Sequence, residues 1–265
     1  MDTVANAAAA QVALAHPAKG PNLTLTQREA SDFAAVIRAA TLIANGRAQR
    51  VLAGVSCEIS VIMHAVLGRY GALTKATTGR PFDLNRDGFV PAEGATMFVL
   101  ESRESAARRD APVRAHLTGW GRANDPTAPS NDWGEGVEVL SIALQASLAR
   151  FGIAARDIDR VISGASGSKR GDALEAHVLR SFFGDDLPPL VAPKALVGEC
   201  GGGYLASVPW AASSNVFPPA LATQSMDPSL GVSSAGGCEL PPSKRALATA
   251  FAAGGSAFWM VLENA

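Results

Sequence analysis

Hydrophobic and polar residues follow different patterns along the chain, and each pattern predicts a type of element. Leu23-Thr24-Leu25-Thr26 alternates apolar and hydroxyl side chains, as a strand does, whereas the apolar, Ala-rich run 31–45 is typical of a helix. Ser31 or Asp32 can cap the start of this helix, and Gly46 lies where a left-handed residue often follows one. Similar patterns predict helices over 3–16, 57–73, 135–152, 173–183 and after the turn 198–203, and strands over 50–54, 97–101, 114–120, 160–163, 189–192, 246–251 and 257–263.

Strands that alternate with helices predict an α/β fold with mostly parallel or mixed sheets. The pattern also starts again after the charged segment 101–113. Phe-Val-Leu-Glu-Ser at 98–102 and Met-Val-Leu-Glu-Asn at 260–264 close the two halves alike. By itself this short echo is weak support for an internal duplication.

The composition is that of a folded protein and argues against several kinds of partner. Of the 265 residues, 48% are hydrophobic and 18% are charged, which is apolar enough for a large core. The net charge is −1 and the basic residues are scattered, so we expect no nucleic-acid partner. We expect a cytoplasmic protein with no membrane partner, because no apolar run is long enough to span a bilayer, the Ala-rich start lacks a basic leader, and three widely spaced cysteines form no disulfide framework.

Several patterns that could bind a ligand fail on their spacing. Asp83-Leu84-Asn85-Arg86-Asp87-Gly88 begins like a calcium loop, but Gly94 stands at the twelfth position, where a bidentate Glu should close the loop. The glycine-rich turn 198–203 matches neither a P-loop nor a dinucleotide fingerprint, and the four histidines have no metal-ligand spacing. The sequence therefore implies no metal and no cofactor.

Three polar residues, Gln27-Arg28-Glu29, stand at the corner between the first predicted strand and the helix that follows it. A helix N-terminus offers unpaired N–H donors and a favourable field for negative charge, so such a corner often holds a catalytic group. Glu29 is therefore the first candidate for a site residue.

The segment PFDLNRDGFVPAEGATMFVLE at 81–101 closely resembles the corresponding segment of the β-ketoacyl synthases of fatty acid and polyketide synthesis. GPNLTLT at 20–26 resembles that family's strand before the nucleophile, SGASGSKRGDALEA at 163–176 its first histidine loop, and KALVGECGGG at 194–203 its second. The resemblance implies a thiolase-like αβαβα sandwich of two related halves. It places a partial N-terminal half, incomplete at its start, at 1–112 and the C-terminal half at 113–265.

The same resemblance locates the family's catalytic positions, and the sequence departs from the family at three of them. The nucleophilic cysteine corresponds to Glu29, and the two histidines correspond to Gly164 and Glu199, whereas the family's lysine is retained as Lys194. A carboxylate is a poor nucleophile towards a thioester, and an ionised Glu199 would repel an enolate that needs hydrogen-bond donors. These departures imply a chain that has lost condensation chemistry, so we expect it not to be an enzyme.

Within the family, the sequence is similar to the chain-length factors of type II polyketide systems, which lack the cysteine and shape the tunnel for the growing chain. The resemblance implies a catalytically silent subunit that forms a heterodimer with an active ketosynthase in polyketide or fatty-acyl synthesis and meets acyl carrier protein through that complex. The residues expected at the tunnel are Ala253, which replaces the gating phenylalanine, and Phe251, and those expected at the dimer interface are Leu23, Thr24, Leu25 and Thr26.

Two other hypotheses remain open. One is an acyltransferase or decarboxylase whose site has moved to Cys200 and Glu199, since Cys200 follows the second histidine position at a predicted helix N-terminus. A buried thiol is the simpler interpretation of Cys200. The other hypothesis is a module that binds carrier protein and has no tunnel.

Overall fold

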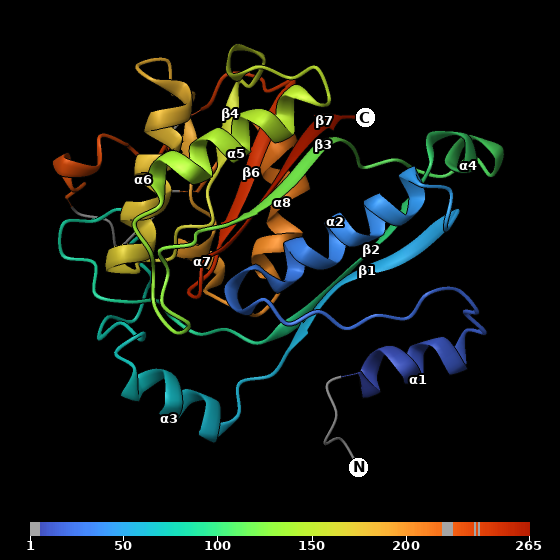
Figure 1. The fold of residues 1–265 in the computed structure, drawn as a ribbon, viewed down its shortest axis with the longest axis horizontal. Coiled ribbons are helices and arrows are strands. Elements are labelled where there is room, and N and C mark those ends of the chain that lie inside the picture. Colours follow the sequence, from blue (N-terminus) through green and yellow to red (C-terminus); the bar gives the residue numbers. More distant parts are fainter. Residues whose placement is uncertain (1–5, 219–224, 236, 238) are drawn as a thin grey trace.

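The computed structural model describes residues 6–218, 225–235, 237 and 239–265 (Figure 1). Strands and helices follow one another much as the sequence predicts, and only the short helices α4 and α7 are missing from the prediction. None of the helices in these ranges has the length and apolarity needed to cross a membrane. The helices are α1 (Ala7–Ala15), α2 (Ser31–Ala44), α3 (Val61–Arg69), α4 (Arg103–Arg108), α5 (Val137–Ala149), α6 (Lys169–Phe183), α7 (Lys194–Val197) and α8 (Gly203–Ser213); the strands are β1 (Arg50–Cys57), β2 (Gly94–Glu101), β3 (Ala115–Asn124), β4 (Arg160–Ile162), β5 (Leu190–Val191), β6 (Arg245–Phe251) and β7 (Ser256–Asn264).

The larger sheet has five strands in the order β3-β7-β6-β4-β5. Its β3, β7 and β6 strands are antiparallel, whereas β6, β4 and β5 run parallel, so the sheet is mixed, as predicted. Leu247 in β6 and Val261 in β7 are fully buried. Strands covered on both faces carry nearly continuous apolar runs, which is why these two are clear in the sequence.

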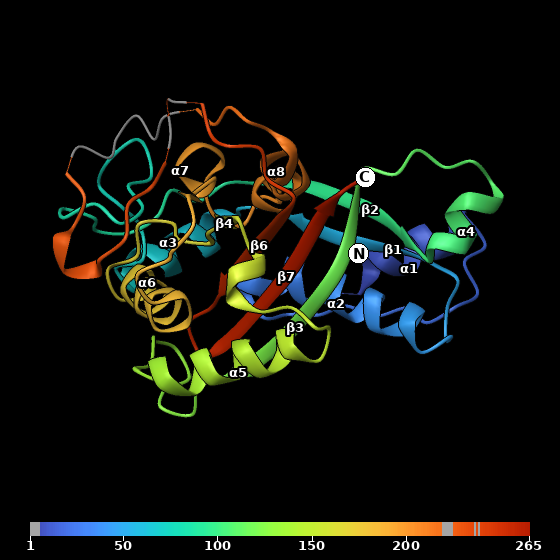
Figure 2. The same cartoon turned by 90° about the horizontal axis from the view of Figure 1, so that it is seen from above.

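Helices cover both faces of this sheet and form two hydrophobic clusters with it (Figure 2). On one face, α5 and α6 contribute Leu144 and Leu179. On the other face, α2 and α8 contribute Phe33 and Leu205, and the rings of Phe33 and Tyr204 stack with centroids 5.4 Å apart. This stacking fixes the start of α2 against the start of α8, where several candidate site residues lie.

Strands β1 and β2 form a separate antiparallel sheet that packs against α2 and α8. Its inner face carries Ala53 and Phe98, which join the core. On its outer face Leu52, Met97 and Val99 are 53%, 50% and 59% exposed. The predicted strand over 97–101 is therefore buried on one face only, since no layer of the described residues covers its second face. The described layers are thus α5 and α6, the large sheet, α2 and α8, and the small sheet.

Residues 23–26 are extended but form no strand, so this prediction is wrong. Their backbone N–H and C=O groups make no hydrogen bond to any described residue, and half of Leu23 is exposed. The alternation of side chains sets the period of a strand, but a strand also needs a hydrogen-bonding neighbour.

Helix α2 starts at Ser31 and is followed by Gly46 at a φ of 65°, which confirms the predicted helix and its left-handed end. The predicted cap is wrong, because the N-cap residue is Ala30 and no side chain caps it. The hydroxyl of Ser31 instead accepts from the N–H of Gln27 at 2.8 Å and donates to the carbonyl of Arg28 at 2.7 Å.

Candidate functional site

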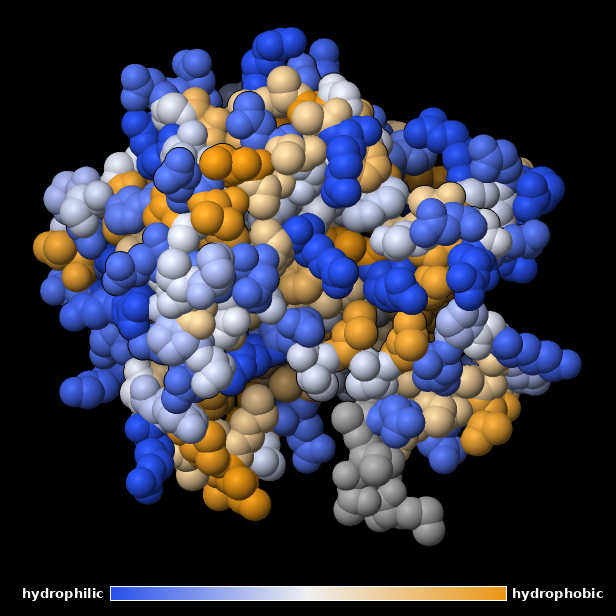
Figure 3. All heavy atoms as spheres, in the orientation of Figure 1, coloured by the Kyte–Doolittle hydropathy of each residue, from blue (hydrophilic) through white to orange (hydrophobic). Residues whose placement is uncertain are grey.

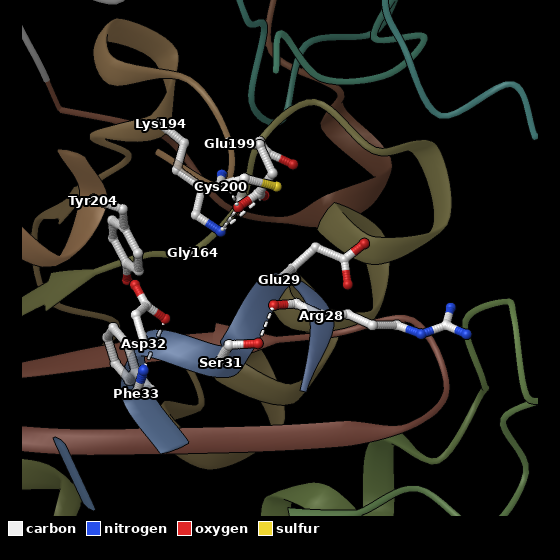
Figure 4. A network of polar contacts seen from close by, with 12 residues as sticks. Arg28, Glu29, Ser31, Asp32, Phe33, Gly164, Lys194, Glu199, Cys200 and Tyr204 are labelled. Atoms are coloured by element: carbon white, nitrogen blue, oxygen red, sulfur yellow. Dashed lines mark hydrogen bonds and ion pairs between the residues drawn. The ribbon is translucent and has the colours of Figure 1, made fainter. Parts of the chain in front are cut away.

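The corner before α2 is a single turn of 3₁₀ helix, Arg28–Ala30, that leads directly into the helix. Arg28 has a φ of 53°, a left-handed conformation that is unfavourable for a residue with a side chain. Its guanidinium group donates to the carbonyl of Ser130 at 2.8 Å, and Ser31 bonds the turn from the other side. Glu29 is part of this tight turn and lies near Lys194, Glu199 and Cys200 (Figure 4).

Glu29 is half-buried, and its Oε2 atom accepts a hydrogen bond from the backbone N–H of Ala253 at 3.2 Å. Burial raises the pKa of its carboxyl group, and the nearby charge of Glu199 raises it further. The turn at Ala253 follows β6, so the fold brings residues from the two ends of the chain together at this carboxylate.

Lys194 and Glu199 form a buried ion pair near Glu29 (Figure 4). The Nζ atom of Lys194 lies 2.7 Å from Oε1 and 2.8 Å from Oε2 of Glu199, and each residue is only 2% exposed. The backbone of Glu199 is held by the segment 90–92, donating to the carbonyl of Val90 at 2.8 Å and accepting from the N–H of Ala92 at 2.7 Å. The ammonium group also lies 4.9 Å from the centroid of the Tyr204 ring.

The carboxyl groups of several residues interact electrostatically with the ammonium group of Lys194. Burial disfavours the Lys194 ammonium, but Glu199 and then Asp32 outweigh burial, and the pKa of Lys194 is raised. Burial raises the pKa of Asp32 to about 6, and the lysine opposes that rise. One cation and the carboxyl groups of Glu29, Asp32 and Glu199 therefore form one coupled electrostatic group.

Cys200 lies directly after this pair, and its N–H donates to Oε1 of Glu199 at 3.1 Å. Burial raises the pKa of its thiol, and Glu199 raises it further, so the thiolate is disfavoured. The residue has a φ of 80°. The sequence does not reveal that Cys57, at the end of β1, lies beside this thiol.

The space beside Gly164 is too small for a side chain. A Cβ atom there would lie 2.6 Å from the carbonyl oxygen of Thr249 in β6, so a side chain requires the strand to move. The N–H of Gly164 donates to Oε1 of Glu175 at 3.0 Å, and the same oxygen accepts from Ser163 Oγ at 2.7 Å and Thr249 Oγ1 at 2.6 Å. Burial raises the pKa of Glu175 to about 7. This carboxyl group organises the loop that follows β4, a role that the sequence analysis missed.

The segment that resembles a calcium loop has a structural role. Asp83 accepts hydrogen bonds from the N–H groups of Asn85 at 2.7 Å and Ser225 at 3.0 Å, and Arg86 pairs with Asp227 at 2.7 Å. Among the residues that the structure describes, no group of three or more His, Cys, Asp or Glu side chains is placed to hold a metal ion. The segment ties distant loops together.

A groove of about 1740 Å³ runs past these residues. Glu29, Glu199, Cys200 and Ala253 line one part of it. Leu23, Thr24, Leu25 and Thr26 line it as well, together with residues of α1, α2, β1 and α3. Lys194 and Gly164 lie behind the wall, and Phe251 is buried in the core rather than at the groove. The structure therefore brings together most of the residues singled out from the sequence, but not Gly164 or Phe251.

Two family models match the chain: the N-terminal domain of β-ketoacyl synthases over residues 1–106 and the C-terminal domain over 115–215. A 3-oxoacyl-[acyl-carrier-protein] synthase 2 from Rhizobium meliloti is 32% identical, over 82% of this chain and 54% of the relative. The ketoacyl synthase beta subunit of the tetracenomycin polyketide synthase from Streptomyces glaucescens is 30% identical, over 84% of this chain and 56% of the relative. The chain therefore spans just over half the length of these curated relatives.

A solved structure of a type II polyketide synthase acyl-carrier protein in complex with its ketosynthase has the same fold. The TM-score is 0.89 at 23% identity, and the match covers 97% of this chain and 66% of that one. This likeness shows that the chain has the thiolase-like α/β fold expected from the resemblance.

The expectation that the chain is not an enzyme is wrong, because it is contradicted by the relatives that the chain is similar to. The Rhizobium meliloti protein and relatives from Mycobacterium and Coxiella carry the name of an enzyme, 3-oxoacyl-[acyl-carrier-protein] synthase 2. The replacements at Glu29, Gly164 and Glu199 alone do not establish that the chain lacks activity. With both family models matching and the fold in agreement, the chain belongs to the β-ketoacyl synthase family.

Proposed function

We propose that the chain is a ketosynthase-family subunit that acts in acyl-chain elongation, in polyketide or fatty-acyl synthesis, together with a cysteine-bearing ketosynthase. In this proposal its groove accommodates the growing chain, which is the role of a chain-length factor. The observation that carries the proposal is the groove itself, because it passes Glu29, Glu199 and Ala253 and continues between α1, α2 and β1.

The size and lining of the groove suit a long acyl chain. At about 1740 Å³ it exceeds the roughly 300–1,000 Å³ typical of sites for small ligands. Val12, Leu23, Leu42 and Leu52 supply apolar lining along its length. A flexible, mostly apolar substrate is the class that such a lining would bind.

The proposed partner is a second ketosynthase-family subunit that contacts residues 23–26. The unpaired backbone groups of this extended segment support the proposal, because such groups can pair with a strand of another chain. Apolar side chains also reach the surface over α1 and α3, where Leu14 is 75%, Val61 87% and Ile62 76% exposed (Figure 3). Exposed apolar surface of this kind is typical of an interaction site.

Pairing is tested by two proline variants expressed together with a ketosynthase subunit of a type II system. Successive N–H groups of a strand point in opposite directions, so only one of Thr24→Pro and Leu25→Pro should remove a donor to the partner. We expect one variant to lose the complex in size-exclusion chromatography while the other keeps it. A wild-type chain that stays monomeric in the presence of the ketosynthase would contradict the proposed pairing.

Occupancy of the groove is tested by an acyl probe. Ala253→Phe should weaken binding of a fluorescent long-chain acyl pantetheine, because the new ring enters the groove. The hydrogen bond from the backbone N–H of residue 253 to Glu29 is kept in this variant. Ala107→Phe on the exposed surface of α4, outside the groove, is the matched control. Equal binding by the two variants would remove the support for an acyl site.

A second candidate, acyl transfer at Cys200, is favoured by the position of that thiol in the groove beside Glu199. The raised pKa of the thiol argues against it. Intact-mass measurement after incubation with acyl carrier protein thioester distinguishes the two candidates, because only the second gives an acyl adduct that Cys200→Ser abolishes.

A further inference from the structure

Two cysteines that are far apart in the sequence meet where the small sheet contacts the turn before α8. Cys57 pairs in register with Gly94 across β1 and β2. The backbone of Gly94 lies so close to the turn that a Cβ atom there would be 2.6 Å from the carbonyl oxygen of Gly201, the residue after Cys200.

Further contacts fix the two segments beside each other. The hydroxyl of Thr96 in β2 donates to the carbonyl of Gly202 at 2.9 Å. A Cβ atom at Gly202 would lie 2.9 Å from a methyl group of Val55, two residues before Cys57, so the end of β1 also meets this turn. Cys57 and Cys200 are both partly exposed and both line the groove, so a small reagent can reach them.

We propose that Cys57 and Cys200 are a redox-modifiable pair that forms a reversible disulfide with a low-molecular-weight disulfide as oxidant. The bond would join the end of β1 to the turn that carries Glu199. This inference is independent of the proposed function, because it concerns a covalent modification of the groove wall and not acyl-chain elongation.

The reaction is thiol–disulfide exchange in two steps. The thiol of Cys57 loses its proton to water, and its thiolate attacks one sulfur of the oxidant; a mixed disulfide forms, and the first thiolate leaves and takes a proton from water. The thiol of Cys200 then loses its proton to water and attacks the Cys57 sulfur, which releases the second thiolate, and this thiolate also takes a proton from water. Two protein thiols are oxidised to one disulfide, and one oxidant disulfide is reduced to two thiols.

The environment of the pair sets its rate. Burial raises the pKa of both thiols, and the charge of Glu199 raises both further. The reactive thiolates are therefore scarce at neutral pH, and the rate of disulfide formation should rise about tenfold per pH unit between roughly pH 7 and 9. The bond closes a long loop of the chain, so oxidation should raise the melting temperature by up to about 10 °C.

The test uses the whole chain with the third cysteine replaced, Cys238→Ser, and oxidised glutathione as the probe. We expect intact mass to show the loss of two hydrogens, and peptide mapping without reductant to show Cys57 joined to Cys200. Added Cys57→Ser or Cys200→Ser should abolish the cross-link and leave a stable glutathione adduct on the remaining cysteine.

If either serine variant fails to fold, differential alkylation of the parent chain before and after oxidation gives the same answer. Both thiols should lose their reactivity together, and dithiothreitol should restore both. Glutathione adducts that accumulate on one cysteine of the parent without a cross-link, or thiols that stay free at pH 9, would overturn the proposal. Neither result depends on whether the chain elongates acyl groups.

Discussion

Replacing Lys194 with methionine removes the ammonium group that faces Glu29, Asp32 and Glu199 in the interior. In the native chain its Nζ atom contacts both oxygens of Glu199, at 2.7 and 2.8 Å, and both residues are 2% exposed. Methionine fills similar space without charge. The variant therefore leaves Glu199 as a buried carboxylate without its cation, which is one of the most destabilising changes in a protein interior.

The loss in the free energy of unfolding follows from what happens to a buried carboxylate when its cation is removed. It takes up a proton, which costs about 1.4 kcal/mol for each pH unit above the value of about 4.3 that is usual for a glutamate side chain in water. At pH 7 this amounts to about 4 kcal/mol, and at pH 5 to about 1 kcal/mol. The pH 7 value agrees with the roughly 3–5 kcal/mol expected when one partner of a buried ion pair is removed.

Urea unfolding followed by circular dichroism at pH 5 and pH 7 measures this cost. Lys75→Met, at an exposed lysine, is the matched control and should change the free energy of unfolding by less than about 0.5 kcal/mol. Adding Glu199→Gln to Lys194→Met should reduce the pH dependence, since the glutamine has no proton to gain and only Glu29 and Asp32 still respond to the missing cation. A loss below about 1 kcal/mol at pH 7, or an equal loss at both pH values, would refute the assigned electrostatic coupling.

Two further predictions concern the interior. Because the pKa of Glu175 is raised to about 7, the folded state binds more protons than the unfolded state between about pH 4.5 and 7. This group therefore lowers the free energy of unfolding as the pH rises through that window. Glu175→Gln should flatten this slope in urea titrations, and an unchanged slope would contradict the assignment. Gly164→Ala should lower the free energy of unfolding by about 1–3 kcal/mol, because the new Cβ atom meets the Thr249 carbonyl. Gly20 has open space around it, so Gly20→Ala should leave the free energy of unfolding nearly unchanged. Equal effects of the two variants would show that the loop after β4 can shift freely.

Much of the fold could be predicted because the apolar periods of buried elements are strong. β6 and β7 are buried on both faces, and α2 has a clear apolar pattern and a left-handed glycine after it. Residues 23–26 carry an equally regular alternation, yet they form no strand, because alternation says nothing about which segment lies alongside. A short apolar run such as 97–101 likewise predicts a strand but cannot show whether one face or both faces of it will be covered.

The site was predictable only as far as the family resemblance extends. It identified Glu29 and Glu199, which line one groove, and Lys194, which supports Glu199 from behind. It could not show that Glu199 is committed to an ion pair, because charge compensation depends on distances between elements. The contact of Cys57 with Cys200 was missed for the same reason, as only the packing of β1 against the turn before α8 brings them together.

The central claim, that this chain shapes acyl-chain elongation with a partner ketosynthase, is tested most directly by the length of the product. The measurement is mass spectrometry of acyl chains released from a reconstituted mixture of the ketosynthase, malonyl-loaded acyl carrier protein and this chain. We expect the chain to be needed for a defined product length, and Ala253→Phe to shorten that product while Ala107→Phe leaves it unchanged. A ketosynthase that gives the same product lengths with the chain, with its Ala253→Phe variant and without either would contradict the account.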